Sequence, residues 1–187
     1  MRGIRVAARD RDRAQGLAAE LTRELGVDAR AVSDYEEAVR GADLVAATTH
    51  SPEPVVQREW LTPGAHITSV GVNPHGRELA GEVVCDALVV VESRAAALAP
   101  FPGGSNDLLW PIRDGLIDEA HIHAELGEIV AGSKPGRTSP EQITLYKVRR
   151  HRRRGRCGRR HRSPRHGGTA DSHPLSPSYL FGLSPDQ

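Results

Sequence analysis

Three pairs of residues in the first half of this 187-residue chain are placed where they could contact a ligand. The pairs are Arg9-Asp10, Thr48-Thr49 and Val70-Gly71. Each pair ends or follows a short apolar run that is typical of a β-strand. Ligands of doubly wound α/β sheets bind beyond the carboxyl ends of the strands, so these positions are the first candidates for a site.

Arg9 and Asp10 favour different forms of a ribose. A carboxylate accepts hydrogen bonds from a free 2′-hydroxyl, whereas a guanidinium neutralises a 2′-phosphate. Because Arg9 comes first, the pair leans towards NADP over NAD. An ordinary turn with two solvated charges has the same sequence signature, and this alternative stays open.

The other two pairs offer uncharged groups. Thr48 and Thr49 could present hydroxyls and backbone amides to a phosphate or a ribose, although threonine is common at strand ends. Val70 and Gly71 could form a wall for a flat ring, because glycine has no Cβ that would keep a ligand from the backbone. A turn glycine is the competing interpretation of Gly71, and position alone favours it.

The elements that would hold these pairs alternate between strands and helices. Apolar spacings of three and four predict a helix over residues 11–25, and Ser33 with Glu36 forms an S-x-x-E capping box for a short helix to Arg40. We expect strands at residues 4–8, 29–32, 43–48, 65–70, 87–91 and 143–146, and helices at 107–117 and 119–131. The apolar run at 87–91 indicates a strand buried on both faces. This order predicts an α/β domain with a parallel sheet.

One part of a dinucleotide-binding fold is missing from the sequence. Such a fold rests the pyrophosphate on a G-x-G-x-x-G loop after its first strand. The pattern does not occur here, and residues 1–8 are too few to hold the strand, loop and helix that should precede. We therefore expect a partial Rossmann-like, doubly wound sheet without its first strand and glycine loop. His121 and His123 have a metal-ligand spacing only on a strand, so we predict structural histidines and no metal site.

Charge is divided unevenly along the chain. Residues 1–147 hold 15 basic and 22 acidic residues and residues 148–187 hold 10 and 2, so the formal net charge of +1 divides into −7 and +8. The basic segment has no apolar periodicity, which predicts a disordered tail at 148–187. No apolar run reaches the ~18 residues of a membrane span and no secretory h-region follows Met1, so we expect a cytoplasmic protein.

Four stretches together resemble the ornithine cyclodeaminase/mu-crystallin family: RVAARDRDRAQGLAAEL, DYEEAVRGADLVAATTHSPEPVV, EWLTPGAHITSVGVNPHGREL and HIHAELGEIVAGSKPGRTSPEQITLYK. The resemblance covers about residues 3–147. It implies a partial Rossmann domain for NAD(H) or NADP(H) at 1–131, and a segment at 132–147 that returns towards a separate substrate and dimerisation domain. Members act as homodimers on the α-carbon of a small amino or imino acid.

The resemblance also implies roles for the three pairs. Arg9 and Asp10 match the ribose-reading turn, Thr48 and Thr49 the nucleotide contacts, and Val70 and Gly71 the nicotinamide wall.

Two departures from the family pattern shape the functional hypotheses. Asn73 stands where ornithine cyclodeaminase has an acid/base aspartate, and an amide cannot exchange a proton at neutral pH. This favours imine reduction or amino-acid oxidation over ornithine deamination, with Asn73 orienting water or substrate. Residues 148–156 can be written in codons that give the family's Ser-Val-Gly-Ile-Ala-Ala-Glu-Asp when read one base on, so we expect a frameshifted tail.

Three functions remain open. The leading hypothesis is a truncated NAD(P)-dependent enzyme, acting as a cyclodeaminase, amino acid dehydrogenase or ketimine reductase when complete and inactive as a separate chain. A second is a non-catalytic NADP-binding protein like mu-crystallin. A third is non-specific, salt-sensitive binding of nucleic acid or another anionic surface through the ten arginines of residues 149–165, a run without interleaved aromatic residues.

Overall fold

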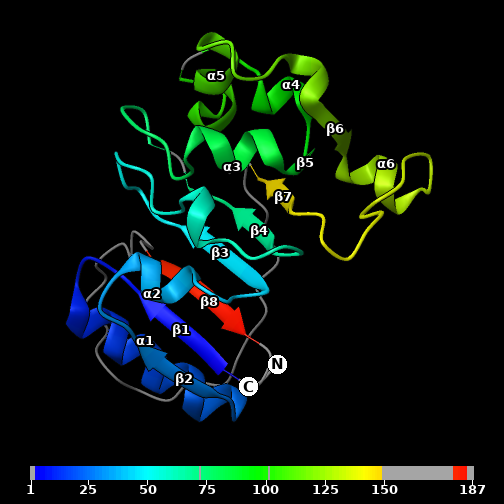
Figure 1. Cartoon of the computed structure of the whole chain (residues 1–187). Coiled ribbons are helices and arrows are strands. Elements are labelled where there is room, and N and C mark those ends of the chain that lie inside the picture. The colour runs from blue at the N-terminus through cyan, green and yellow to red at the C-terminus, as the bar shows by residue number, and fades with distance from the viewer. Residues whose placement is uncertain (1–2, 72, 101, 149–178, 185–187) are drawn as a thin grey trace, which may run out of the picture.

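A computed structural model describes residues 3–71, 73–100, 102–148 and 179–184, which form one eight-stranded sheet with its helices (Figure 1). The strands are β1 (Gly3–Ala7), β2 (Asp28–Ala31), β3 (Leu44–Thr48), β4 (His66–Ser69), β5 (Leu88–Val91), β6 (Ile122–Glu125), β7 (Thr144–Lys147) and β8 (Tyr179–Ser184). Their order across the sheet is β2-β1-β8-β3-β4-β7-β5-β6. Neighbouring strands run parallel except where β8 pairs with β1 and β3.

Short helices connect most of these strands. They are α1 (Arg11–Leu25), α2 (Tyr35–Val39), η1 (Arg58–Trp60), α3 (Gly81–Asp86), α4 (Arg94–Ala97), α5 (Asn106–Arg113), η2 (Glu119–His121) and α6 (Leu126–Val130). Parallel strands joined through helices confirm the predicted α/β class. The sequence β2-β1, then β8, then β3-β4 corresponds to the 3-2-1-4-5 order of a dinucleotide-binding sheet, with β8 in the place of the first strand.

Helix α1 forms where the apolar spacing predicted it. The Asp10 carboxylate caps its first turn by accepting from the Arg13 N–H at 3.1 Å. Gly26 ends it in the left-handed conformation, with φ of 65°, and donates its N–H to the Thr22 carbonyl at 3.0 Å. Ala14 and Ala18 are buried against β1, together with Ile4 and Val6 of that strand.

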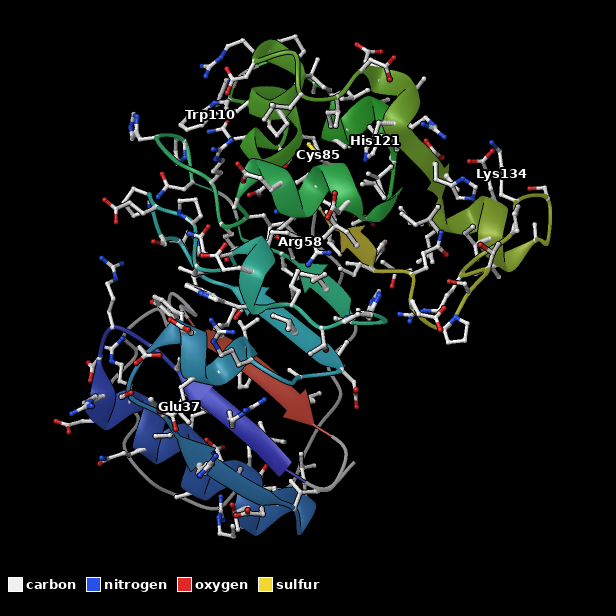
Figure 2. All side chains as sticks on the ribbon, in the orientation of Figure 1. Glu37, Arg58, Cys85, Trp110, His121 and Lys134 are labelled. Carbon is white, nitrogen blue, oxygen red and sulfur yellow. The ribbon has the colours of Figure 1, made fainter. Side chains whose placement is uncertain are left out.

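The predicted capping box of α2 is wrong by one residue. Asp34, not Ser33, is the N-cap, and its side chain accepts from the Glu37 N–H at 2.8 Å. The Glu37 carboxylate in turn accepts from the Ser33 N–H at 3.1 Å. The Asp34 carboxylate takes the place of the serine hydroxyl as acceptor for the orphan amide, and it also adds negative charge at the helix N-terminus. Figure 2 shows Glu37 on this helix.

The predicted helix over residues 119–131 is also wrong. The segment folds as η2, strand β6 and then α6. Ile122 and Ala124 alternate with half-buried neighbours, and β6 pairs in parallel with β5. The pairing partner lies more than thirty residues upstream, and such a tertiary contact overrides a weak local helical pattern. Helix α5 likewise ends earlier than predicted, before Gly115, whose φ is 72°.

The C-terminal tail is not disordered throughout. Tyr179–Ser184 forms β8, so the prediction of disorder is wrong for these six residues. Residues 149–178, which include all ten tail arginines, lie outside the described residues, and so does the hypothesis of an anion-binding tail. None of the helices in the described part of the chain is long and apolar enough to cross a membrane.

The main core lies between the sheet and helices α2 and α3, whereas the opposite face is only partly covered. Val89 and Val91 of β5 are fully buried, but Leu88 and Val90 are half-buried, so the prediction of burial on both faces holds for one face. On the less covered side, Leu88 and Val90 line an apolar cavity of about 330 Å³ together with His66 of β4.

His66 makes the stability of this region pH-dependent. Burial, with a smaller effect from the Arg137 guanidinium, lowers the pKa of His66 from 6.5. The unfolded chain therefore takes up its proton first as the pH falls below about 6.5, and the folded state loses stability there. We expect the free energy of unfolding in urea to fall less between pH 7.5 and 5.5 in His66→Gln than in the wild type. An equal change of the unfolding free energy with pH in the two proteins would contradict this assignment.

Candidate functional site

The turn between β1 and α1 brings Arg9 and Asp10 to the carboxyl edge of the sheet, and both side chains are exposed. Asp10 serves the helix: besides capping it, the carboxylate pairs with Arg13 Nε at 3.2 Å. Burial raises the pKa of Tyr35, and the nearby Arg9 guanidinium acts in the opposite direction. Asp10 is thus used by the helix cap, and a nucleotide contact of Arg9 stays a prediction.

The carboxyl end of β3 is tied to a buried carboxylate. Thr49 and Glu78 are each 1% exposed. One carboxylate oxygen of Glu78 accepts from the Thr49 N–H, and the other accepts from the Ser69 hydroxyl at 2.8 Å. The Thr49 amide, which the sequence offered to a phosphate, is therefore used by the protein's own anion. Ligand contacts through the Thr48 and Thr49 hydroxyls stay a prediction.

Gly71 follows β4 and is held on both of its backbone polar groups. Its N–H donates to Glu78 Oε2 at 2.8 Å, and its carbonyl accepts from Lys147 Nζ at 2.8 Å. A Cβ at this position would overlap the Glu78 carboxyl group, while φ is not positive. Close approach of a carboxylate, rather than a turn, requires the glycine. Val70 is half-buried beside it, and its N–H donates to the Ala47 carbonyl at 2.9 Å.

Lys147, the last residue of β7, is 1% exposed and completes the arrangement. Its ammonium group donates to Asp107 Oδ2 at 2.7 Å and to Ser69 Oγ at 2.8 Å, in addition to the Gly71 carbonyl. An ammonium has three N–H donors, so all of them are satisfied. The other oxygen of Asp107 accepts from the Glu78 N–H at 2.7 Å and from a second backbone amide at 3.0 Å.

These groups form one connected unit, the carboxylate–lysine network. Its members are Thr49, Ser69, Gly71, Glu78, Asp107 and Lys147. It joins the carboxyl ends of β3, β4 and β7 to the first turn of α5, and its three ionisable side chains carry a formal charge of −1. A satisfied buried network of this kind rigidifies its surroundings, so the Gly71 backbone is a fixed surface at the site.

The Asn73 side chain holds the loop after Gly71. Its Nδ2 donates to the His50 carbonyl at 2.7 Å, and its Oδ1 accepts from the His75 N–H at 2.8 Å. Asn106 Nδ2 in turn donates to the Asn73 carbonyl at 2.9 Å. The amide therefore connects the loops after β3 and β4, with one N–H and one lone pair left for water or substrate.

The two histidines of the possible metal pattern bond to backbone carbonyls. His121 Nε2 lies 2.8 Å from the Val84 carbonyl, beside α3, where Figure 2 labels it, and His123 Nε2 lies 2.8 Å from the Pro135 carbonyl. No group of three or more potential ligands gathers within the described residues.

The sequence alone did not predict the three charged residues of this network: Glu78, Asp107 and Lys147. In the sequence each of them has the features of an ordinary surface charge, because no short motif connects the three. One signal was available for the last of them. The chain has two lysines against 23 arginines, and one of the two, Lys147, closes an apolar strand.

The strand order, with parallel ladders on either side of β8, defines a doubly wound α/β domain with the strand order of dinucleotide-binding sheets. Comparison with known proteins places it within this class. The sequence model of the ornithine cyclodeaminase/mu-crystallin family matches residues 1–149, and the chain belongs to this family. The match confirms the resemblance drawn from the four sequence stretches.

Two curated relatives illustrate the range of the family. A Delta(1)-pyrroline-2-carboxylate reductase of Bacillus cereus is 38% identical over 141 residues, which cover 74% of this chain and 42% of the relative. The ketimine reductase mu-crystallin of Rattus norvegicus is 38% identical over 145 residues, covering 77% of this chain and 41% of that protein. The chain thus spans less than half the length of these relatives.

Solved structures agree with the sequence comparisons. The Delta(1)-pyrroline-2-carboxylate reductase of Thermococcus litoralis, in complex with NADH and L-proline, has a TM-score of 0.74 and 38% identity, over 79% of this chain and 45% of that one. An archaeal alanine dehydrogenase dimer with bound NAD has a TM-score of 0.68 and 29% identity, over 80% and 44% of the two chains.

Proposed function

We propose that the chain is a dinucleotide-binding part of an oxidoreductase that moves a hydride between NAD(P)H and the α-carbon of an amino or imino acid. The observation that carries this proposal is the similarity, over 79% of this chain, to a reductase solved with NADH and L-proline. The residues at the carboxyl edge are of the types that a dinucleotide needs: a cation at Arg9, hydroxyls at Thr48 and Thr49, and a rigid backbone at Gly71.

Each of these residues has a distinct part in the proposed reaction. Arg9 neutralises a ribose phosphate, Thr48 and Thr49 contact the nucleotide, and Val70 with Gly71 forms the wall for the nicotinamide, which when bound supplies or accepts the hydride. The formal charge of −1 in the network behind Gly71 stabilises positive charge on a ring placed there. Asn73 orients water or substrate and transfers no proton, which favours imine reduction or amino-acid oxidation over deamination.

A chimera tests the chemistry directly. Residues 3–148 replace the matched region of the Thermococcus litoralis reductase, and NADH oxidation is followed with Δ1-pyrroline-2-carboxylate. We expect turnover in the chimera and none in the purified 187-residue chain, which lacks the G-x-G-x-x-G pattern. A folded chimera that binds NADH without reducing the imine would refute the catalytic proposal and favour a non-catalytic nucleotide-binding protein. Turnover by the chain alone would refute its inactivity.

The choice between NAD and NADP depends on Arg9. In the same chimera, Arg9→Ala should weaken NADPH binding roughly 10- to 100-fold and leave NADH binding nearly unchanged, because a hydrogen bond to a charged group contributes roughly 1.5–3 kcal/mol. Arg11→Ala, which changes another exposed arginine two residues on, is the matched control. Equal loss of both nucleotides, measured by fluorescence titration, would show that Arg9 does not read the 2′-phosphate.

Three further parts of the proposal concern the complete protein of which this chain is proposed to be a part. We propose a cytoplasmic homodimer, to be tested by fractionation and by light scattering of the protein that carries the remainder of the fold.

We also propose that the sequence after Lys147 results from a change of reading frame. DNA resequencing should then reveal a Ser-Val-Gly continuation one base on, and its absence would dismiss the frame change.

A further inference from the structure

Strand β8 holds the two parts of the sheet together. It pairs along five residues with β1 on one side and along five residues with β3 on the other. In the described part of the chain no ladder joins β1 to β3 directly, so the facing edges of both strands depend on β8 for their hydrogen bonds. Figure 1 shows its red arrow between the blue β1 and the cyan β3.

The space that β8 fills is apolar on both faces, and on the face towards α2 it leaves no room for a Cβ at one position. Leu180 is fully buried in the main core, while Phe181 and Leu183 pack on the other face with Ala14 and Ala18 of α1. At Gly182 a Cβ would overlap the Ala38 carbonyl of α2. A strand in this position must therefore be apolar on both faces and must have a glycine where it passes α2.

The direction of β8 is the exception in the sheet. β1 and β3 are parallel to each other, as judged from their common antiparallel pairing with β8, and every other ladder is parallel. Their facing edges can form ladders with a strand of either direction. In the dinucleotide-binding order this place belongs to a strand parallel to both neighbours, followed by a glycine-rich turn.

We propose that the space between β1 and β3 is a strand-acceptor site, which β8 fills by self-complementation. Its exchange partner is an extended apolar peptide segment that enters parallel to β1 and β3 and ends in a glycine-rich turn. In that direction the turn emerges at the carboxyl edge, between Ala7 and Thr48. The inference concerns the sheet and is independent of the nucleotide chemistry, so either can fail alone.

Hydrogen exchange of the full chain tests the first part of the proposal, that β8 fills the space between β1 and β3. In the wild type, the amides of β1 and β3 are protected as well as those of β5. In Gly182→Val, whose side chain conflicts with Ala38, protection of β1 and β3 should fall about tenfold or more while β5 keeps its own, because local opening is independent of distant strands. Gly16→Ala, with open space around its Cβ, is the control. Unchanged protection of β1 and β3 would overturn the proposal.

Peptides added to Gly182→Val test the second part of the proposal, that a parallel segment can take the place of β8. The first is Val-Ile-Gly-Ile-Val followed by Gly-Ala-Gly, with the inner glycine at the place of Gly182 and a nitroxide at the glycine-rich end, and the second is the β8 sequence SYLFGLS. We expect the first peptide to restore protection of β1 and β3, and its nitroxide to broaden signals of Thr48 rather than Gly3. Restoration by the β8 peptide alone, or by neither, would overturn the parallel partner.

A disulfide keeps the proposal testable if Gly182→Val unfolds the whole chain. Ala46 and Phe181 are directly paired across β3 and β8, within the Cα separation that a disulfide spans. A variant with Ala46→Cys and Phe181→Cys, and with Cys85→Ser and Cys157→Ser to remove the native thiols, should form this bond within one chain under mild oxidation. A failure to cross-link, or cross-linking only between chains, would overturn self-complementation.

Discussion

Replacing Lys147 with methionine should lower the free energy of unfolding by about 3–5 kcal/mol, the usual effect of breaking a buried charge pair from one side. The methionine fills most of the volume but leaves Asp107 Oδ2 without its partner at 2.7 Å, and the Gly71 carbonyl without a donor. In a chain of this size the loss corresponds to a fall in Tm of roughly 10 °C. Calorimetry and urea unfolding measure both.

The other lysine of the chain is a matched control. Lys134 lies exposed in the loop after α6, as Figure 2 shows, and Lys134→Met should change stability by about 0.5 kcal/mol or less. Combining Lys147→Met with Asp107→Asn should cost less than the sum of the single changes, because the uncompensated carboxylate disappears with its partner. Additive losses would show that Lys147 acts through its volume and not through its charge.

Elements with strong local signals could be predicted from the sequence. α1 combines a helical apolar face with a capping aspartate and a C-terminal glycine, and all three act within a few residues of one another. Residues 119–131 carry a weaker pattern, and there the edge of β5 decides the outcome by pairing with β6. Local physics fixes an element only where no distant strand competes for the same backbone groups.

The strand at Tyr179–Ser184 had a local signal that charge obscured. Tyr-Leu-Phe-Gly-Leu is the one apolar run in a tail rich in arginine, serine and proline. The average composition of the tail indicates disorder, but stability of a strand depends on the few residues that enter the sheet. The place that this run fills is set by β1 and β3, which no property of residues 179–184 reveals.

The outline of the site was predictable and its chemistry was not. Because parallel strands share a carboxyl edge, the turn after β1 and the ends of β3 and β4 could be placed together from the sequence. The side chains of Glu78, Asp107 and Lys147 meet only through three separate connections of the sheet. Their separation along the chain leaves no motif, so only the folded arrangement shows that the Gly71 backbone is held by a carboxylate and an ammonium.

Gly71→Ala is expected to destabilise the chain by about 3 kcal/mol or more. The added methyl group would overlap the Glu78 carboxyl group, which has no free volume to enter because Glu78 is 1% exposed. Displacing this carboxylate leaves the buried N–H groups of Thr49 and Gly71 without an acceptor, at a cost of roughly 1–3 kcal/mol each. Gly127→Ala, where a Cβ meets nothing, should stay within about 0.5 kcal/mol.

The same overlap predicts a non-additive pair. Glu78→Ala alone removes the acceptor and should cost about as much as Gly71→Ala, whereas the double variant should be no worse than either, since the methyl group then occupies the emptied space. Urea unfolding of the four proteins closes this cycle. A double variant that loses the sum of both effects would mean that Gly71 and Glu78 act separately. Agreement with the predicted cycle would show that position 71 requires glycine because the Glu78 carboxylate, which holds the backbone of the candidate site, needs that space.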